Sequence, residues 1–326
     1  LAIDLRRPES KEIMEGLVKW ADVLIESYSV GVIDRIGLGY DNLKKINDKL
    51  IMVSTSLMGQ TGALRNISGF GNIGASVAGF YPFGGWPDRA PCGPFAAYSD
   101  FISPRFTAAA ILGALDHRDQ TGEGQYIDYS QMEGAVHLLS PAFLDQQVNG
   151  VRGTRIGNRD ANMAPHGAYS VVGEDRWLAL ACENDKQWRA LVELLGRTDL
   201  ADLSLSERID RHDEIDSIIG DWTRGLAGEK AEVELQKVGV AAHRILYAPD
   251  VVNDAQMKHR GAFTQVAHEK WEQTWIEENP IHLSRTPGSA NWAAPTFGEH
   301  LFPILTEILG HTEDEAAELI ASGMFI

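Results

Sequence analysis

Asp100 is the acidic residue of an apolar stretch, 97–106, whose residue types suggest chemistry. Ser103 followed by Pro104 predicts the start of a helix, because serine is a preferred N-cap and proline fits the first helical position. Gly122 predicts where this helix ends. Asp100 would then lie in a loop that faces the positive end of the helix, where a carboxylate is held ionised and reactive. The other interpretation, a turn or capping residue, stays open, because aspartate is common in turns.

The composition is typical of a globular protein and narrows the classes of partner. The chain has 326 residues, enough for one large or two medium domains, with 44% hydrophobic and 23% charged residues. Its 29 basic and 46 acidic residues give a net charge of −17, which argues against nucleic acid and anionic membranes as partners. Cys92 and Cys182 are far apart, so a reducing, cytoplasmic location is the simplest prediction.

Several familiar sequence signals are absent. The chain has no HExxH, no CxxC and no P-loop, so the sequence predicts no metal site. It also has no run of eighteen apolar residues and no visible signal peptide, so we expect no membrane-spanning helix. The first residue is Leu1 within an apparent strand, from which we expect that the natural beginning is missing.

Residues 1–55 predict an α/β fold. The continuous apolar runs Val23–Ile25 and Leu50–Val53 alternate with helical patterns, which indicates a parallel sheet covered on both faces. Ligands of such sheets bind beyond the carboxyl ends of the strands, here at Glu26–Ser29 and 54–62.

The rest of the chain suggests a large domain and a smaller one. Residues 56–99 are rich in Gly and Pro and predict a long substrate-covering connection. A basic linker then leads into a mixed α+β pattern. We therefore expect a large domain formed by 1–150 and 270–326, and a linker with a small α+β domain over 151–269.

The chain resembles the family III CoA-transferases, which include formyl-CoA and carnitine CoA-transferases and α-methylacyl-CoA racemases. The resemblance covers nearly the whole chain, and the order and spacing of the motifs make it specific. The matching segments are Leu5–Glu9, Ile25–Tyr28, Asp34–Leu38, Leu115–Gln125, His259–Phe263, Ala294–Pro295, Gly298–His300 and Leu309–Gly310. Relative to the family, an amino-terminal strand–helix unit that supplies part of the CoA site is missing.

The resemblance implies a Rossmann-like large domain with a parallel sheet, a smaller α+β domain and an interlocked homodimer. It implies coenzyme A, carried as an acyl-CoA substrate, a small carboxylic acid as the second substrate, and no metal. Asp100 matches the family's catalytic aspartate, which forms an anhydride with the acyl group and then an aspartyl-CoA thioester. Backbone N–H groups of five glycines are candidates for oxyanion donors, with flexible turns as the alternative: Gly59, Gly62, Gly69, Gly71 and Gly74.

The resemblance also implies residues that bind CoA. Arg35 matches the arginine that contacts CoA, with a solvated surface arginine as the alternative. Ile36, the next residue, is also expected at the CoA site. Tyr28 stands where the family often has Phe and is expected to stack on adenine. Ser27 replaces a frequent Asn, and Arg6 takes the place of a frequent Lys.

Phe70 separates the two branches of the family. The racemases pair the aspartate with a His in a Gly-His-Asp segment, and the matching segment here is Ser68–Gly71, with Phe70 in place of the base. No His occurs between residues 1 and 116. We therefore expect a transferase that moves CoA from an acyl-CoA to a carboxylic acid. An α-methylacyl-CoA racemase or epimerase and a non-catalytic CoA-binding protein are the alternatives.

Overall fold

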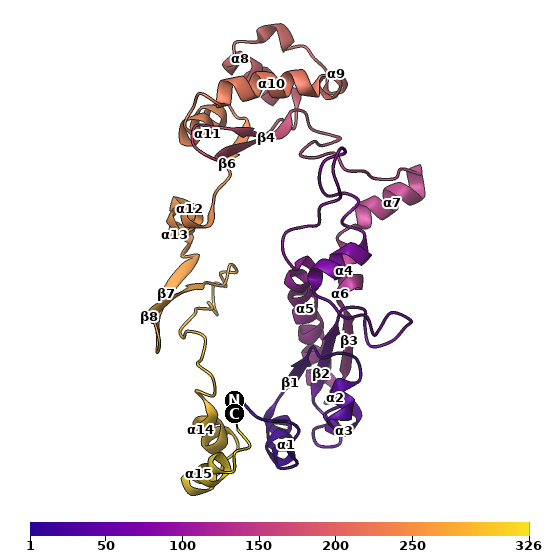
Figure 1. Cartoon of the computed structure of the whole chain (residues 1–326), viewed down its shortest axis with the longest axis vertical. Helices are drawn as coiled ribbons and strands as arrows, with labels where there is room; N and C mark the ends of the chain where they lie inside the picture. The colour runs from indigo at the N-terminus through magenta and orange to yellow at the C-terminus, as the bar shows by residue number, and fades with distance from the viewer. Residues whose placement is uncertain (326) are drawn as a thin grey trace. The chain divides into compact units, whose positions relative to one another are not determined.

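The chain divides into two units, each with its own sheet, in a computed structural model that describes residues 1–325 (Figure 1). Unit 1 comprises Leu1–Gly84, Ala90–Arg155 and the segment from Ala294 onward. Unit 2 comprises Gly85–Arg89 and Ile156–Ala293. By their contacts, residues 270–293 therefore group with unit 2, whereas the sequence placed them in the large domain. The assignment of functional domains stays a prediction.

Unit 1 contains the predicted parallel sheet, and this mixed α/β architecture is confirmed. Its strands are β1 (Val23–Glu26), β2 (Ile51–Ser56) and β3 (Tyr126–Ser130), with β2 between the other two. Ile25, Val53 and Ile127 lie side by side across the sheet. The first four residues of β2 are buried, as expected for a central strand of continuous apolar sequence.

Several helices of unit 1 pack on this sheet in small clusters. One cluster combines Val18 and Leu43 with Leu50 and Met52, and another joins Ile51 and Val53 to Ala114. The helical elements are α1 (Ser10–Trp20), α2 (Val32–Arg35), α3 (Tyr40–Leu43), α4 (Gly71–Ala78), α5 (Tyr98–Thr121), α6 (Gln131–His137), α7 (Ser140–Asn149), α14 (Leu301–Pro303), the π-helical turn η2 (Ile304–Ile308) and α15 (Glu313–Ala321).

The predicted start of the central helix is wrong. α5 begins at Tyr98, so Asp100 lies in its first turn and Pro104 lies inside it. Pro104 has no N–H for the carbonyl of Asp100, the acceptor four residues back. Two hydroxyl groups bond locally around this break: Ser103 Oγ donates to the Ser99 carbonyl at 2.6 Å, and Thr107 Oγ1 donates to the Ser103 carbonyl at 2.9 Å.

Two other local predictions also differ from the structure. The Gly-rich region 56–99 contains the helix α4, which its many small residues concealed. The apolar run at the start of the chain forms only an isolated bridge, between Ile3 and Phe325.

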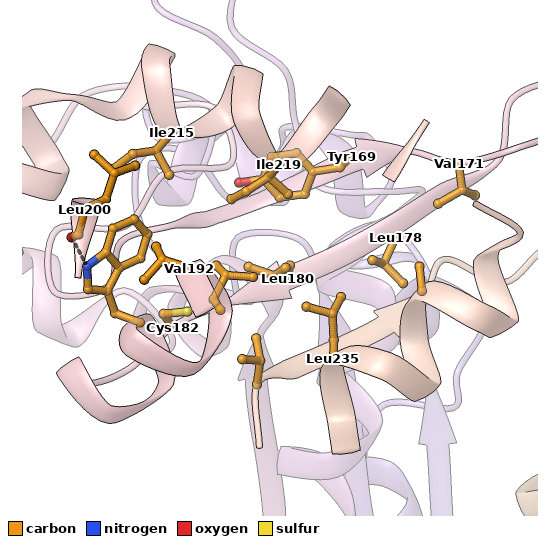
Figure 2. Packing of buried hydrophobic residues seen from close by; sticks show 14 residues of the cluster. Tyr169, Val171, Leu178, Leu180, Cys182, Val192, Leu200, Ile215, Ile219 and Leu235 are labelled. Carbon is orange, nitrogen blue, oxygen red and sulfur yellow. Dashed lines mark hydrogen bonds between the residues drawn. The ribbon is translucent and has the colours of Figure 1, made fainter. Parts of the chain in front are cut away.

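Unit 2 has an antiparallel sheet with strand order β4–β5–β6 and one continuous core. Figure 2 shows this core, in which Leu178 and Leu180 of β5 meet Val192, Ile219 and Leu235 from three helices. The elements are β4 (His166–Ser170), β5 (Trp177–Ala181), α8 (Asp185–Leu194), η1 (Thr198–Leu200), α9 (Leu205–Asp210), α10 (His212–Thr223), α11 (Gly228–Lys237) and β6 (Ala241–Arg244).

Unit 2 continues with two short helices and a hairpin that the sequence did not predict. They are α12 (Ala248–Asn253), α13 (Ala255–Arg260), β7 (Phe263–His268) and β8 (Glu272–Glu277). β7 and β8 pair antiparallel with each other and with no other named strand of residues 1–325.

Two kinds of feature are absent from the described residues. Within residues 1–325, no helix has both the length and the apolar character needed to cross a bilayer. The same residues hold no group of three or more His, Cys, Asp or Glu side chains placed to bind a metal ion.

Candidate active site

A cleft of about 610 Å³ lies in unit 1 at the carboxyl ends of the three parallel strands. It is lined by 27–30 after β1, by Thr55–Leu57 at the end of β2, and by Gln131 directly after β3. The segment 65–70 and Asp100 complete the lining. The cleft therefore lies at the edge of the sheet where the sequence predicted a ligand.

Asp100 presents its carboxylate at the meeting point of two helices. It is half-buried in the first turn of α5, and its Oδ2 accepts a hydrogen bond of 3.0 Å from the backbone N–H of Gly71, the first residue of α4. Both helix N-termini carry positive partial charge, which favours an anion at this place. Oδ1 has no hydrogen-bond partner within the described residues, so one carboxylate oxygen is held and the other is available.

Glycines allow α4 to approach α5 this closely. A Cβ on Gly71 would lie 2.5 Å from both the carbonyl oxygen of Ala97 and the backbone nitrogen of Asp100. A Cβ on Gly74, one turn later, would lie 2.4 Å from Ser99 Oγ. Because the obstacles at Gly71 are backbone atoms, a larger residue there must push the two helices apart and lengthen the bond to Asp100.

Two polar side chains tie the start of α5 to α6, and a third lies unpaired in the cleft lining. Ser99 is fully buried, and its Oγ donates to Gln131 Oε1 at 3.2 Å, which ties α5 to α6. The buried Ser56 Oγ, at the end of β2, has no hydrogen-bond partner. An unpaired buried hydroxyl costs free energy, so this group at the cleft lining is a natural partner for a ligand or a water molecule.

The structure brings two of the predicted CoA-binding residues into the cleft with Asp100. Ser27 and Tyr28 both line it, and the side chain of Tyr28 is half exposed. Their loop is positioned by Glu26, a buried residue whose Oε2 accepts the backbone N–H of Tyr28 at 2.7 Å.

The other three predicted residues lie outside the cleft lining. Arg35 is exposed at the end of α2, and its guanidinium makes no ion pair or hydrogen bond within residues 1–325. Ile36 packs against the core cluster around Leu43. Arg6 forms a two-pronged pair with Asp4, and these hydrogen bonds lower the pKa of Asp4 to about 2. Of these three residues, Arg35 is the one with a cationic side chain that is unpaired within residues 1–325.

Residues that the sequence analysis did not single out also belong to the cleft. Gln131 reaches Ser99, and Arg65 is an exposed cation in the lining. Gln131 follows directly after a strand, and Arg65 lies in the Gly-rich segment before Asp100. These positions were the sequence signals that could have identified them as cleft residues. Gly71 was one of five glycine candidates, and the structure distinguishes it by its bond to Asp100.

A larger cleft, of about 1020 Å³, lies within unit 2 and contains none of the predicted site residues. Its lining includes His166 and Trp177 and the pair Tyr169–Asp216, whose hydroxyl donates to the carboxylate at 2.7 Å. Burial, together with the neighbouring Asp216, raises the pKa of Tyr169 above its ordinary value. The side chain therefore acts as a neutral donor that stabilises β4 against α10.

Comparison with known proteins points to one family. The model of CoA-transferase family III matches residues 1–301. The chain is 31% identical to succinyl-CoA–D-citramalate CoA-transferase of Chloroflexus aurantiacus, over 98% of this chain and 81% of that protein. It is 29% identical to succinate–glutarate CoA-transferase of Agrobacterium fabrum, over 94% of this chain and 78% of that protein.

A solved structure agrees in fold. The crystal structure of a CAIB/BAIF family protein from Brucella suis superposes with a TM-score of 0.86 at 30% identity. The match covers 94% of this chain and 80% of that chain, so it includes both units.

Proposed function

Because the chain belongs to CoA-transferase family III, we propose that it moves CoA from an acyl-CoA donor to a carboxylic acid, with Asp100 as the nucleophile. The observation that carries this proposal is the Asp100 carboxylate, half-buried in the cleft with Oδ2 held by Gly71 and Oδ1 unpartnered. A nucleophile needs a lone pair that points at the substrate and a side chain with little conformational freedom. A carboxylate held through one oxygen meets both requirements.

In the first half-reaction, Oδ1 attacks the thioester carbonyl carbon of the donor. The carbon–sulfur bond breaks, CoA leaves as a thiolate, and the acyl group remains on Asp100 as a mixed anhydride. The thiolate then attacks the aspartyl carbonyl carbon, which releases the donor acid and leaves CoA on Asp100 as a thioester. Every bond broken is replaced by one formed, so the sequence needs no oxidant, reductant or net proton.

In the second half-reaction, the acceptor acid repeats these steps in reverse. Its carboxylate attacks the aspartyl thioester and displaces the thiolate, and the thiolate then attacks the acceptor's own carbonyl carbon. The product is the acceptor's CoA thioester, and Asp100 returns as a free carboxylate. The N–H of Gly71, which bonds Oδ2, supports the negative charge that develops on the aspartyl oxygen.

CoA itself is proposed to bind along the loop after β1. Tyr28 and Ser27 line the cleft, and Tyr28 offers an exposed ring for adenine. Arg35, which has no ion pair within the described residues, supplies a guanidinium for a phosphate group. Arg6 is a weaker candidate because it is already paired with Asp4.

The substrates are proposed to be small acids that carry two carboxyl groups. The two transferases compared above carry the names of succinyl-CoA with citramalate and of succinate with glutarate, and all of these acids are dicarboxylic. A racemase is less well supported, because Phe70 stands in the cleft and no histidine is among the described residues that line it.

We also propose that the protein is a homodimer, in which two chains interlock. No residue of α7 is buried, although Phe143, Leu144 and Val148 are apolar. Phe101 and Leu112 of α5 are likewise more than half exposed. Apolar helices left open in this way are typical of an interface.

Hydroxylamine trapping tests the role of Asp100. The protein is incubated with acyl-CoAs, hydroxylamine is added, and peptides are read by mass spectrometry. We expect a hydroxamate on Asp100 that requires a thioester substrate. Asp100→Asn should reduce transfer by about 10³-fold or more, since the nucleophile is lost while the amide keeps the shape.

The matched control is Asp119→Asn, which changes an exposed carboxylate on the same helix and should leave transfer unchanged. An unmodified Asp100 in a protein that binds CoA would overturn the covalent mechanism. Exchange of the α-hydrogen of the acyl group in D₂O without an acceptor would instead establish a racemase.

A further inference from the structure

Arg65 is the one positively charged side chain among the described residues that line the cleft. The only other charged residue of that lining is Asp100. The cleft therefore offers one nucleophilic anion and one cation, set in a lining of neutral residues.

The guanidinium of Arg65 is exposed and makes no ion pair or hydrogen bond within residues 1–325. Arg118 of the same unit, by contrast, is paired with Asp22 at 2.8 Å. In a chain with a net charge of −17, acidic partners are plentiful, so a cation left unpaired in a cleft is available to a ligand.

The position of Arg65 relates it to the reacting group. Arg65 begins the segment 65–70, and this segment leads directly to Gly71, whose N–H holds Asp100. Arg65 and Asp100 thus line one cleft and are connected through one short stretch of backbone. Arg35, by contrast, is exposed at the end of α2 and is not part of the lining, which suits the distant phosphates of CoA.

We propose that Arg65 binds the remote carboxylate of a dicarboxylic acyl group while the other end of that group reacts at Asp100. This inference rests on the proposed function. The guanidinium pairs with a carboxylate through two parallel hydrogen bonds, and an acyl group that ends in a methyl offers no such partner. Because donor and acceptor acids occupy the same place next to Asp100 in turn, Arg65 selects dicarboxylic acids in both half-reactions.

The test compares two donors of equal chain length, succinyl-CoA and butyryl-CoA, in the hydroxylamine assay without an acceptor. Arg65→Gln should lower the second-order rate constant of hydroxamate formation on Asp100 with succinyl-CoA by about 10- to 100-fold, the size expected for loss of a charged pair. It should change this rate constant for butyryl-CoA by less than about threefold. Arg152→Gln, which removes an exposed charge of unit 1 outside the cleft, should leave the ratio between the donors unchanged.

Inhibition by free CoA separates this role from phosphate binding. We expect the inhibition constant of CoA to be the same in Arg65→Gln and in the unchanged protein. An equal loss for both donors, together with weaker inhibition by CoA, would overturn the inference and make Arg65 a phosphate ligand. An unchanged preference between the donors would overturn it as well. If the unchanged protein forms no hydroxamate with either donor, the proposed function itself fails.

Discussion

Unit 2 gathers fourteen buried residues into one hydrophobic cluster, whereas unit 1 distributes its buried residues over three clusters of six, four and three among residues 1–325. The long helix α5 illustrates the contrast, because only Ser99, Ser103, Thr107 and Ala114 of its 24 residues are buried. Unit 2 thus supplies its own core. Unit 1, which holds the candidate active site, has no single core of that size, as expected of a unit that the proposed dimer would complete.

A change at Trp188 tests how much the core of unit 2 contributes to stability. Its ring is 1% exposed, and its indole N–H donates to the Leu200 carbonyl at 2.9 Å, the bond drawn in Figure 2. Trp188→Ala should lower the free energy of unfolding by about 3–5 kcal/mol through the cavity it leaves. Urea denaturation followed by circular dichroism measures this loss. Trp20→Ala, at a side chain that is 63% exposed, should cost less than about 1 kcal/mol; equal losses would contradict the contrast.

Gly71 tests whether the candidate site depends on close helix packing rather than on a large core. Gly71→Ala should reduce transfer by about 100-fold, because the new Cβ displaces α4 from Asp100. Steady-state kinetics measures the loss. Gly113→Ala is the control, since a Cβ there meets no atom within 4 Å and should stabilise α5 slightly. Full activity of Gly71→Ala would show that the bond to Asp100 is dispensable.

The exposed apolar residues of α7 test whether this helix lies in the proposed dimer interface. Leu144→Lys with Val148→Lys places two charges on this helix and should weaken the proposed dimer by about tenfold or more. Analytical ultracentrifugation measures the monomer–dimer equilibrium. Gln147→Lys adds a charge to the same helix at an exposed polar position and should leave association unchanged. A dimer that resists both changes would remove α7 from the interface.

The two cysteines differ in burial, and the buried one makes the stability of unit 2 depend on pH. Burial raises the pKa of Cys182 from 9.0 to about 12, whereas Cys92 in unit 1 is exposed. Cys182 therefore stays protonated when folded. Its contribution to stability is fully present below pH 9 and is lost as the pH rises towards 12.

Thiol labelling at pH 8 should modify Cys92 rapidly and Cys182 at least about 100-fold more slowly. Labelling in urea serves as the control, since both thiols should then react alike. Equal rates without urea would mean that the core of unit 2 opens readily.

The sequence predicted those parts of unit 1 that depend on local pattern. The apolar runs at Val23–Ile25 and Leu50–Val53 became β1 and β2, and the cleft lies at their carboxyl ends. Family resemblance led to Asp100, Ser27 and Tyr28, which the structure brings to this one cleft, although their roles stay predictions.

What the sequence could not predict depends on tertiary contacts. Ser103 and Pro104 carry a strong start signal, but the helix begins at Tyr98, where Asp100 bonds Gly71 of α4 and Ser99 bonds Gln131 of α6. The hydrogen bond from Gly71 to Asp100 joins residues 29 positions apart. It could not be predicted without knowing which glycine of α4 packs against the backbone of α5. Arg65 stands in a Gly-rich segment without a period, where only the fold reveals what a side chain lines.

The bridge between Ile3 and Phe325 has a consequence for the order of folding. Nearby, Ile13 of α1 packs with Leu305, Ala316 and Met324, which follow it by about 300 positions in the chain. A growing polypeptide cannot make these contacts until residues 301–325 have left the ribosome, whereas nearly all of unit 2 is contiguous and precedes that segment. The small cluster that joins both ends is therefore expected to assemble last, after the unit inserted between them has folded.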